Sequence, residues 1–346
     1  MKSLARRKNV EYGISVEPTW RIGYSVELAK LAEKLGFSNV WVPDGGPAPP
    51  YSDSTVTLAG IATSTTRIKY GSAILNFFTR SPAWIASSFL ALSDLGSWKH
   101  KTLQRAVLGL GLGSAYNVAK FGISKRSGMN DQMREAVESI RALMDGKQVT
   151  ARTDSFAIEQ VQLSKSRKKI PIHIGAHGPR GLRLAGEIAD GVILTDRIAG
   201  DIEESMKHVT LGLSDGSKTR NDLEITNSVV ISVDENRKKA RNAARTTCAY
   251  LVAWMTDEKA QAHQINTEAK SKIASFINAG DEPSAAKLVG ERMLDLLTVS
   301  GNAEECIEKC REHLAQGIDQ IAFCEPFGPN PVRSIEMIAR QVTRKI

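Results

Sequence analysis

The sequence predicts an α/β fold in which eight parallel strands, each followed by a helix, close into a (β/α)8 barrel, or TIM barrel. Short apolar runs alternate about eight times with segments whose apolar residues recur at helical spacing. Glycine or proline stands at many of the junctions between them. The length of 346 residues also suits a barrel, because this fold routinely holds about 250 residues or more around one core.

Each strand is expected where an apolar run of strand length ends in glycine, proline or a polar residue. Asp53 and Ser54 are expected to cap the second helix, Pro82 to open the third and Gly36 to close the first. The predicted strands cover residues 10–16, 37–43, the first part of 67–82, 104–112, 170–175, 190–195, 223–233 and 318–324. The predicted helices cover residues 26–35, 53–65, 82–95, 130–144, 179–189, a segment that starts near 234, 302–316 and 331–342.

Two segments fall outside the strand and helix repeat. Residues 150–169 are polar and basic, and we expect a surface connection there with room for a hairpin. Residues 256–300 are charged and helical in character, which predicts a helical insertion before the last strand. Because a barrel of this length holds one core, residues 1–346 are predicted to form a single domain that contains the insertion.

The composition is that of an ordinary globular protein, with 42% hydrophobic and 24% charged residues. No apolar run approaches the ~20 residues that cross a bilayer, and the basic N-terminus lacks the apolar core of a signal peptide. We therefore expect a cytoplasmic protein without membrane contact. The net charge of +8 is scattered and no nucleic-acid-binding motif accompanies it, so small acidic molecules are expected as partners rather than nucleic acid.

The four cysteines predict no metal site. They include no C-x-x-C pair, and Cys306 and Cys310 lie one helical turn apart. Reduced thiols that are buried for structural reasons account for this spacing.

The stretch 67–82, RIKYGSAILNFFTRSP, is expected to form the floor of an active site, because a buried strand there ends in polar and aromatic side chains. The reactive groups of a barrel lie at the C-terminal ends of its strands. Polar residues or glycines that follow the other strands are therefore candidates as well. The candidates are Glu17, Asp44, Asn76, Gly113 with Ser114, and His177.

The most specific stretch is 172–191, IHIGAHGPRGLRLAGEIADG, which contains the turn from Gly175 to Pro179. Gly175, Ala176 and Gly178 let the backbone pass close to a ligand, and Pro179 suits the first position of the next helix. The start of that helix would present N–H groups and a positive dipole end to a phosphate. A tight turn that needs glycine only for its geometry explains the same residues equally well, and His177 alone is more often a surface residue than a catalyst.

Three segments, GSAILNFFTRSP (71–82), RAVLGLGLGS (105–114) and IHIGAHGPRGLRLAGEIADG (172–191), resemble the bacterial-luciferase-like superfamily. They are most similar to its branch that uses the deazaflavin coenzyme F420, and within that branch to the methylenetetrahydromethanopterin reductase family. The resemblance runs from about Glu11 to the C-terminus and includes CEPFGPN after the eighth strand. It implies a TIM barrel of the luciferase-like type.

The resemblance also implies roles for single residues. A non-prolyl cis peptide bond is implied between Ala73 and Ile74, where it supports the bent deazaflavin ring from behind. Asp44 corresponds to an aspartate that contacts the ring, Asn76 to a polar residue at the ring edge, and 175–179 to the turn that holds the phosphate. The implied cofactor-binding residues are Asp44, Ala73, Ile74, Asn76, Gly113, Gly175, Ala176, His177, Gly178 and Pro179.

Two departures from the reductase pattern concern the substrate side of the site. The glutamate that the reductases place at the end of the first strand falls on Ser15 here, and Glu17 stands two residues later. A shift of two residues keeps the same side of a strand, so Glu17 replaces that glutamate only where the strand runs on or the loop folds back. After Asp44 the reductases have a histidine and a polar run, whereas residues 45–50 here read GGPAPP.

The expected function is hydride transfer between F420 and an organic substrate, and the resemblance implies a pterin that carries a one-carbon unit. Asp44 and Glu17 are the catalytic candidates, and Ser15 and Glu17 line the substrate side. The alternatives are an FMN-dependent luciferase-like monooxygenase or reductase, and a non-catalytic relative that binds a ligand. A homodimer or larger oligomer is implied through helices 53–65 and 82–95, although an ordinary core face explains their apolar residues as well.

Overall fold

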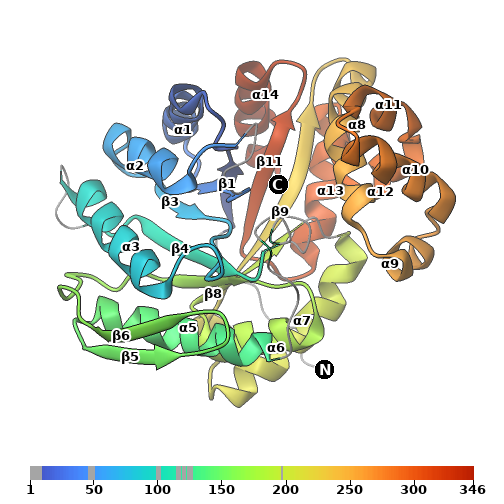
Figure 1. The fold of residues 1–346 in the computed structure, drawn as a ribbon. Helices are drawn as coiled ribbons and strands as arrows, with labels where there is room; N and C mark the ends of the chain where they lie inside the picture. Colours follow the sequence, from blue (N-terminus) through green and yellow to red (C-terminus); the bar gives the residue numbers. More distant parts are fainter. Residues whose placement is uncertain are drawn as a thin grey trace. The chain divides into compact units, whose positions relative to one another are not determined.

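The structure, a computed structural model, describes residues 10–45, 51–98, 103–113, 118, 122, 128–195 and 198–346 (Figure 1). Its parallel strands close into the predicted (β/α)8 barrel. The barrel strands are β1 (Glu11–Ser15), β2 (Asn39–Val42), β3 (Lys69–Ser72), β4 (Ala106–Gly111), β7 (Ile172–Gly175), β8 (Gly191–Thr195), β9 (Glu224–Val233) and β11 (Gln320–Phe327). The helices between and after them include α1 (Ile22–Leu35), α2 (Ser54–Ser64), α3 (Pro82–Ser97), α5 (Met129–Met144), α6 (Pro179–Ile188), α7 (Ala199–Asp215), α8 (Arg237–Trp254), α13 (Ala303–Ala315) and α14 (Pro331–Met337).

The pairing of the strands aligns their ends. The strands β1, β2, β3, β4, β7 and β8 are neighbours in that order, and β9 pairs with β8 and with β11, which pairs with β1. Ser15 lies opposite Trp41, and Gly111 lies opposite Gly175. Because these strands run in the same direction, their C-terminal ends meet at one edge, where the predicted site residues stand.

The helix caps and the hairpin form at the residues that the sequence predicts. Gly36 ends α1 with a left-handed φ of 89°, which glycine adopts without steric cost. The Asp53 carboxylate accepts hydrogen bonds from the backbone N–H groups of Thr55 and Val56 at the start of α2. Pro82 occupies the first turn of α3. The polar connection after α5 contains the expected hairpin, in which β5 (Val149–Arg152) pairs antiparallel with β6 (Ala157–Val161).

The chain divides into two compact units. The first comprises Met1–Thr195, Glu203–Thr226 and Gly317–Ala322, and the second comprises Asp196–Ile202, Asn227–Gln316 and Phe323–Ile346. All the predicted site residues belong to the first unit. The prediction of a single domain over residues 1–346 stays a prediction.

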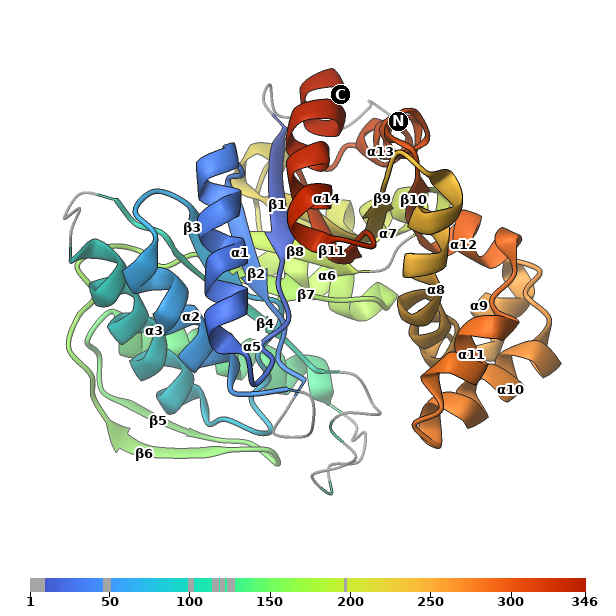
Figure 2. The ribbon, with the colours of Figure 1, turned by 90° about the horizontal axis from the view of Figure 1, so that it is seen from above.

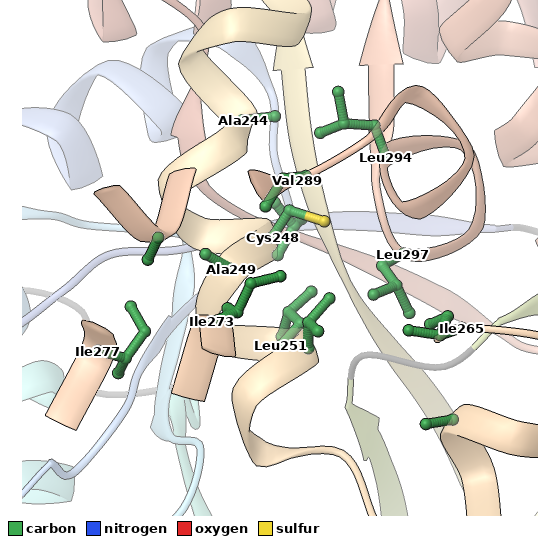
Figure 3. Close-up of a cluster of buried hydrophobic side chains, with 14 residues drawn as sticks. Ala244, Cys248, Ala249, Leu251, Ile265, Ile273, Ile277, Val289, Leu294 and Leu297 are labelled. Atoms are coloured by element: carbon green, nitrogen blue, oxygen red, sulfur yellow. The ribbon is translucent and has the colours of Figure 1, made fainter. Parts of the chain in front are cut away.

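The second unit has a core of its own around α8 (Figure 3). The predicted helical segment 256–300 supplies α9 (Asp257–Ala262), α10 (Thr267–Asn278), α11 (Glu282–Leu288) and α12 (Glu291–Leu297). Cys248 of α8 lies in this core together with Ile273 of α10 and Leu294 of α12. Burial raises the pKa of the Cys248 thiol to about 12, so the group stays protonated and acts as a small apolar side chain.

Two expectations about these segments need correction. The predicted helical segment ends too late, because Val299–Gly301 forms strand β10, which is buried and pairs in parallel with β9. No helix was predicted between the sixth and seventh strands, yet α7 spans Ala199–Asp215. Its buried residues Ile202, Met206, Val209 and Leu213 recur at helical spacing, which is the signal that identifies it.

Within the described residues, no helix combines the length and the apolar character that crossing a membrane requires. The expected cytoplasmic location stays a prediction.

Candidate functional site

The described site residues lie just beyond the C-terminal ends of neighbouring strands of the first unit. Ser15 ends β1 and is buried, and Gly175 ends β7. Asp44, Asn76 and Gly113 follow β2, β3 and β4 within a few residues. The barrel therefore brings these predicted residues to one mouth. Ser114 and residues 46–50, which the sequence also suggested, lie outside the described residues.

Ala73 and Ile74 form an apolar floor at this mouth. The peptide bond between them is cis, as the resemblance implied. Ile74 packs between two glycines, because a methyl group on Gly111 would lie 2.8 Å from its Cδ1 and one on Gly175 would lie 2.8 Å from its Cγ2. Both side chains of the floor are only partly buried. The two predicted strand ends thus meet at Ile74.

Asn76 holds the loop that follows the floor. Its Oδ1 accepts hydrogen bonds from the backbone N–H groups of Phe78 and Thr79 and from the Thr79 hydroxyl, at 3.0 to 3.1 Å. The side chain is 6% exposed, and its Nδ2 would lie 3.7 Å from a methyl group on Gly113. Asn76 therefore shapes the loop with its oxygen, while its amide nitrogen faces the end of β4.

Asp44 pairs with a residue that sequence reasoning did not assign. The Arg80 guanidinium lies 3.7 Å from the Asp44 carboxylate and 2.7 Å from that of Asp53. Burial acts to lower the pKa of Arg80, but the hydrogen bond to Asp53 and the two carboxylate charges raise it above its usual value. Arg80 lies in the same polar loop as Asn76. Its position in that loop is the signal by which the sequence could have identified it as a site residue.

The Asp53 carboxylate gives a pH-dependent contribution to stability. Burial acts to raise its pKa, but hydrogen bonds from Thr55 and Arg80 lower it below 3.8. A lowered folded-state pKa stabilises the fold above the unfolded value, and this stability is lost as the pH falls through the lowered pKa. We expect Asp53→Asn, which retains a capping oxygen, to cost about 1 kcal/mol or less near neutral pH, because solvent screens this pair.

Urea unfolding measured from pH 7 down to pH 3 checks this prediction. The difference between the wild type and Asp53→Asn should be constant above about pH 5 and should shrink below 3.8. Asp94→Asn, at an exposed position on α3, is the control. A difference that grows on acidification would contradict the assignment.

The turn at residues 175–179 leaves the start of α6 accessible. Gly178 is the N-cap residue of α6, and no side chain caps the helix there. His177, Gly178 and Pro179 are exposed, and a methyl group on Gly178 would meet nothing within 4 Å. His177 Nε2 lies 3.1 Å from the Thr195 hydroxyl at the end of β8. The backbone N–H groups of the first turn of α6 can therefore receive an anion.

Glu17 follows β1 by two residues and is half-buried. The Val16 N–H donates to the Trp41 carbonyl at 2.9 Å, so the pairing of β1 with β2 continues beyond Ser15. The Ser25 hydroxyl donates to the Glu17 carbonyl at 2.7 Å and fixes the backbone. An extended backbone through Glu17 would put its side chain on the same side as Ser15. In the part of the chain that the structure describes, no cluster of three or more His, Cys, Asp or Glu side chains could hold a metal ion.

The fold and this mouth define a barrel protein with an apolar floor and an accessible helix start at the same mouth. Residues 9–320 match the model of the luciferase-like monooxygenase family. The chain belongs to this family and is an oxidoreductase of the luciferase-like type.

Several relatives are similar over nearly the whole chain. The 5,10-methylenetetrahydromethanopterin reductases of Archaeoglobus fulgidus and Methanolobus tindarius are 32% and 30% identical to it, and the matches cover 97% and 96% of this chain and 100% and 99% of theirs. The solved coenzyme F420 dependent tetrahydromethanopterin reductase from Methanopyrus kandleri has a TM-score of 0.88 at 26% identity, covering 97% of this chain and 99% of that one.

More distant neighbours share the fold. An F420-dependent secondary alcohol dehydrogenase has a TM-score of 0.78 at 20% identity, and the match covers 96% of this chain and 98% of that one. The oxygenating constituent of 3,6-diketocamphane monooxygenase from Pseudomonas putida, solved with FMN, has a TM-score of 0.72 at 16% identity, with 98% and 99% coverage. The F420-dependent relatives are thus the more similar ones, and FMN occurs in a more distant neighbour.

Proposed function

We propose that this protein is a coenzyme F420-dependent oxidoreductase that transfers hydride between the deazaflavin and an organic substrate. The observation that carries the proposal is the juxtaposition of the partly exposed Ala73–Ile74 floor with the accessible start of α6, at one mouth of the barrel. The whole-length similarity to F420-dependent reductases supports it.

The residues present suit a flat ring with an anionic tail. Ala73 and Ile74 offer apolar surface to one ring face. The Ile74 side chain has no room to shift toward Gly111 or toward Gly175, because it already lies against both glycines. The Asn76 amide nitrogen is a donor for a ring-edge oxygen. The first turn of α6 suits the phosphate because its N–H groups and dipole favour negative charge.

When bound, F420 supplies a two-electron hydride carrier, and the protein supplies binding, orientation and charge. The apolar floor keeps water from one face of the ring, which leaves the other face for the substrate. Asp44 is the proposed ring contact, and Arg80 beside it offsets part of its charge. Fixing the donor and acceptor atoms at reacting distance provides about 7 kcal/mol or more of the acceleration.

We propose a pterin that carries a one-carbon unit as the substrate. The support is that the relatives with 30% and 32% identity are named 5,10-methylenetetrahydromethanopterin reductases. Glu17 takes the place of the reductase glutamate in this proposal, next to Ser15. The continued pairing of β1 with β2 at Val16 supports this role, because it carries the strand toward Glu17.

Titration of the purified protein with oxidised and reduced F420, and separately with FMN, tests the function. We expect binding of F420 in the micromolar range or tighter, and hydride transfer to a pterin-bound one-carbon unit without oxygen uptake. A bound flavin spectrum, or consumption of the reduced cofactor by oxygen, would favour the FMN-dependent monooxygenase instead. Binding of neither cofactor would favour the non-catalytic relative.

We also propose a homodimer that forms through α2 and α3, which lie side by side in both views of the fold (Figures 1 and 2). Trp84, Ala91, Leu95 and Trp98 recur on one face of α3 and are exposed, Trp84 by 72% and Trp98 by 80%. An exposed apolar stripe of this kind marks an interaction surface. A second copy of the chain is the proposed occupant.

Light scattering checks this proposal. The wild type should have twice the monomer mass, and the double variant Trp84→Glu/Leu95→Glu should shift toward the monomer, because burying a carboxylate in an apolar contact is costly. Leu211→Glu, at an exposed leucine on α7, is the control and should leave the mass unchanged. A wild-type mass equal to that of the monomer would rule out the proposed homodimer.

A further inference from the structure

Trp41 of β2 lies inside the barrel, below the floor of the mouth. Its indole is buried together with Val107, Ile193 and Ala322, and Ala73 and Ile74 pack against this cluster. The ring occupies space that glycine provides, because a methyl group on Gly71 would lie 2.8 Å from its Cζ3. The apolar floor therefore rests on a layer in which Trp41 is the largest side chain.

Gln320 of β11 fixes how far along the barrel axis the Trp41 indole lies, from the amino-terminal side of the ring. The indole N–H donates to Gln320 Oε1 at 2.7 Å, and both side chains are buried. Gly13 on β1, the strand between them, leaves room for this bond, since a methyl group there would lie 3.4 Å from Gln320 Oε1 and 2.9 Å from the Asn39 carbonyl oxygen. A larger residue at position 13 would push against this contact.

Two carboxylates fix which way the Gln320 amide points. Its Nε2 donates to Glu11 at 3.4 Å and to Glu224 at 3.3 Å, at the amino-terminal end of the barrel. A carboxylate accepts and does not donate, so the amide nitrogen must face these groups and the amide oxygen must face the indole. Lys69 lies 3.2 Å from Glu11 and keeps that carboxylate in place.

We propose that Gln320 and Trp41 are positioning residues for the cofactor. Gln320 keeps the indole in the position along the barrel axis from which it supports Ala73 and Ile74, and these two residues contact the deazaflavin ring. This inference rests on the proposed function, because it assigns to the two residues the support of the same ring. Neither side chain touches the ring, and both act through the floor.

The variant Gln320→Met tests the proposal, because methionine nearly matches glutamine in size but offers the indole N–H only a weakly accepting sulfur. We expect F420 to bind about tenfold more weakly, since a buried donor without a partner favours a shifted indole. In Trp41→Phe the N–H is already gone, so adding Gln320→Met should produce little further loss. Such non-additivity identifies Gln320 as acting through Trp41.

Tyr70→Phe is the matched control for stability. Tyr70 on β3 is also a buried aromatic with one hydrogen bond, 2.6 Å to the Leu92 carbonyl, but it packs beside Gly96 of α3 and not inside the barrel. This variant should lower the unfolding midpoint as much as Gln320→Met while F420 binding stays unchanged. Equal losses of F420 affinity in both variants would reduce the role of Gln320 to general stability and overturn the proposal.

The indole N–H resonance of Trp41 provides a readout that needs no turnover. In wild-type protein we expect it to exchange slowly with solvent and to shift when F420 is added. An unchanged resonance in the presence of bound F420, or Gln320→Met that binds F420 as tightly as the wild type, would overturn this inference alone. If the wild type fails to bind F420 at all, the proposed function and this inference fall together. If Gln320→Met does not fold, the shift of the wild-type indole resonance and the F420 affinity of Trp41→Phe test the inference instead.

Discussion

Replacing Arg105 with leucine is expected to lower the free energy of unfolding by about 4 kcal/mol, a large loss for a single side chain. Arg105 immediately precedes β4 and is 2% exposed. Its guanidinium also lies over the Tyr70 ring, 5.0 Å from the centroid.

The size of the effect follows from the carbonyl groups that Arg105 serves. It donates to the backbone carbonyls of Ala62 and Thr65 at the end of α2, of Ile68 before β3 and of Gly96 at the end of α3, at 2.7 to 3.3 Å. Leucine would leave these buried acceptors unsatisfied, and each such group costs about 1 kcal/mol or more.

Urea unfolding followed by circular dichroism measures this loss. Arg105→Lys should recover only part of it, because one ammonium cannot reach carbonyls on both helices. Arg67→Leu, at a nearby exposed position, should change stability by no more than about 0.5 kcal/mol. A loss below about 1 kcal/mol for Arg105→Leu would mean that water replaces the guanidinium at these carbonyls.

The second large effect concerns function. Gly175→Ala is expected to lower the rate of hydride transfer about 100-fold, because a misplacement of about 1 Å at a reacting centre can cost this much. The new methyl group would lie 2.8 Å from Ile74 Cγ2. Ile74 cannot move away toward Gly111, where its Cδ1 already fills the space, so it must move toward the ring.

A second substitution separates this effect from misfolding. Ile74→Ala removes the atom that clashes, so adding Gly175→Ala to Ile74→Ala should cause no further loss of stability, while the rate of hydride transfer stays low because the floor is truncated. Gly23→Ala on α1, where a methyl group would meet nothing within 4 Å, is the control for a tolerated glycine substitution. Stopped-flow reduction of F420 gives the rate. Wild-type rates in Gly175→Ala would show that Ile74 yields without cost and would contradict the floor as described.

Local signals in the sequence predicted most of the barrel, because strand length, helical periodicity and caps act between residues a few positions apart. Asp53 capped its helix and Gly36 ended one as predicted. The prediction missed helix α7, because no strong cap or turn residue marks it in the sequence. It also extended the helical segment over β10, where pairing with β9 outweighed helical character. The strand-end candidates Asp44, Asn76 and His177 followed from topology, because parallel strands bring their ends together.

The sequence by itself determined the fold class, the strand-end residues that share one mouth and, through resemblance, the Ala73–Ile74 bond. Only the tertiary structure decided which atoms these residues meet. Asp44 and Asp53 share Arg80, Ile74 lies between Gly111 and Gly175, and Trp41 bonds to a residue 279 positions away. Such contacts leave no periodic trace in the chain, because they depend on side chains that meet only after the barrel has closed.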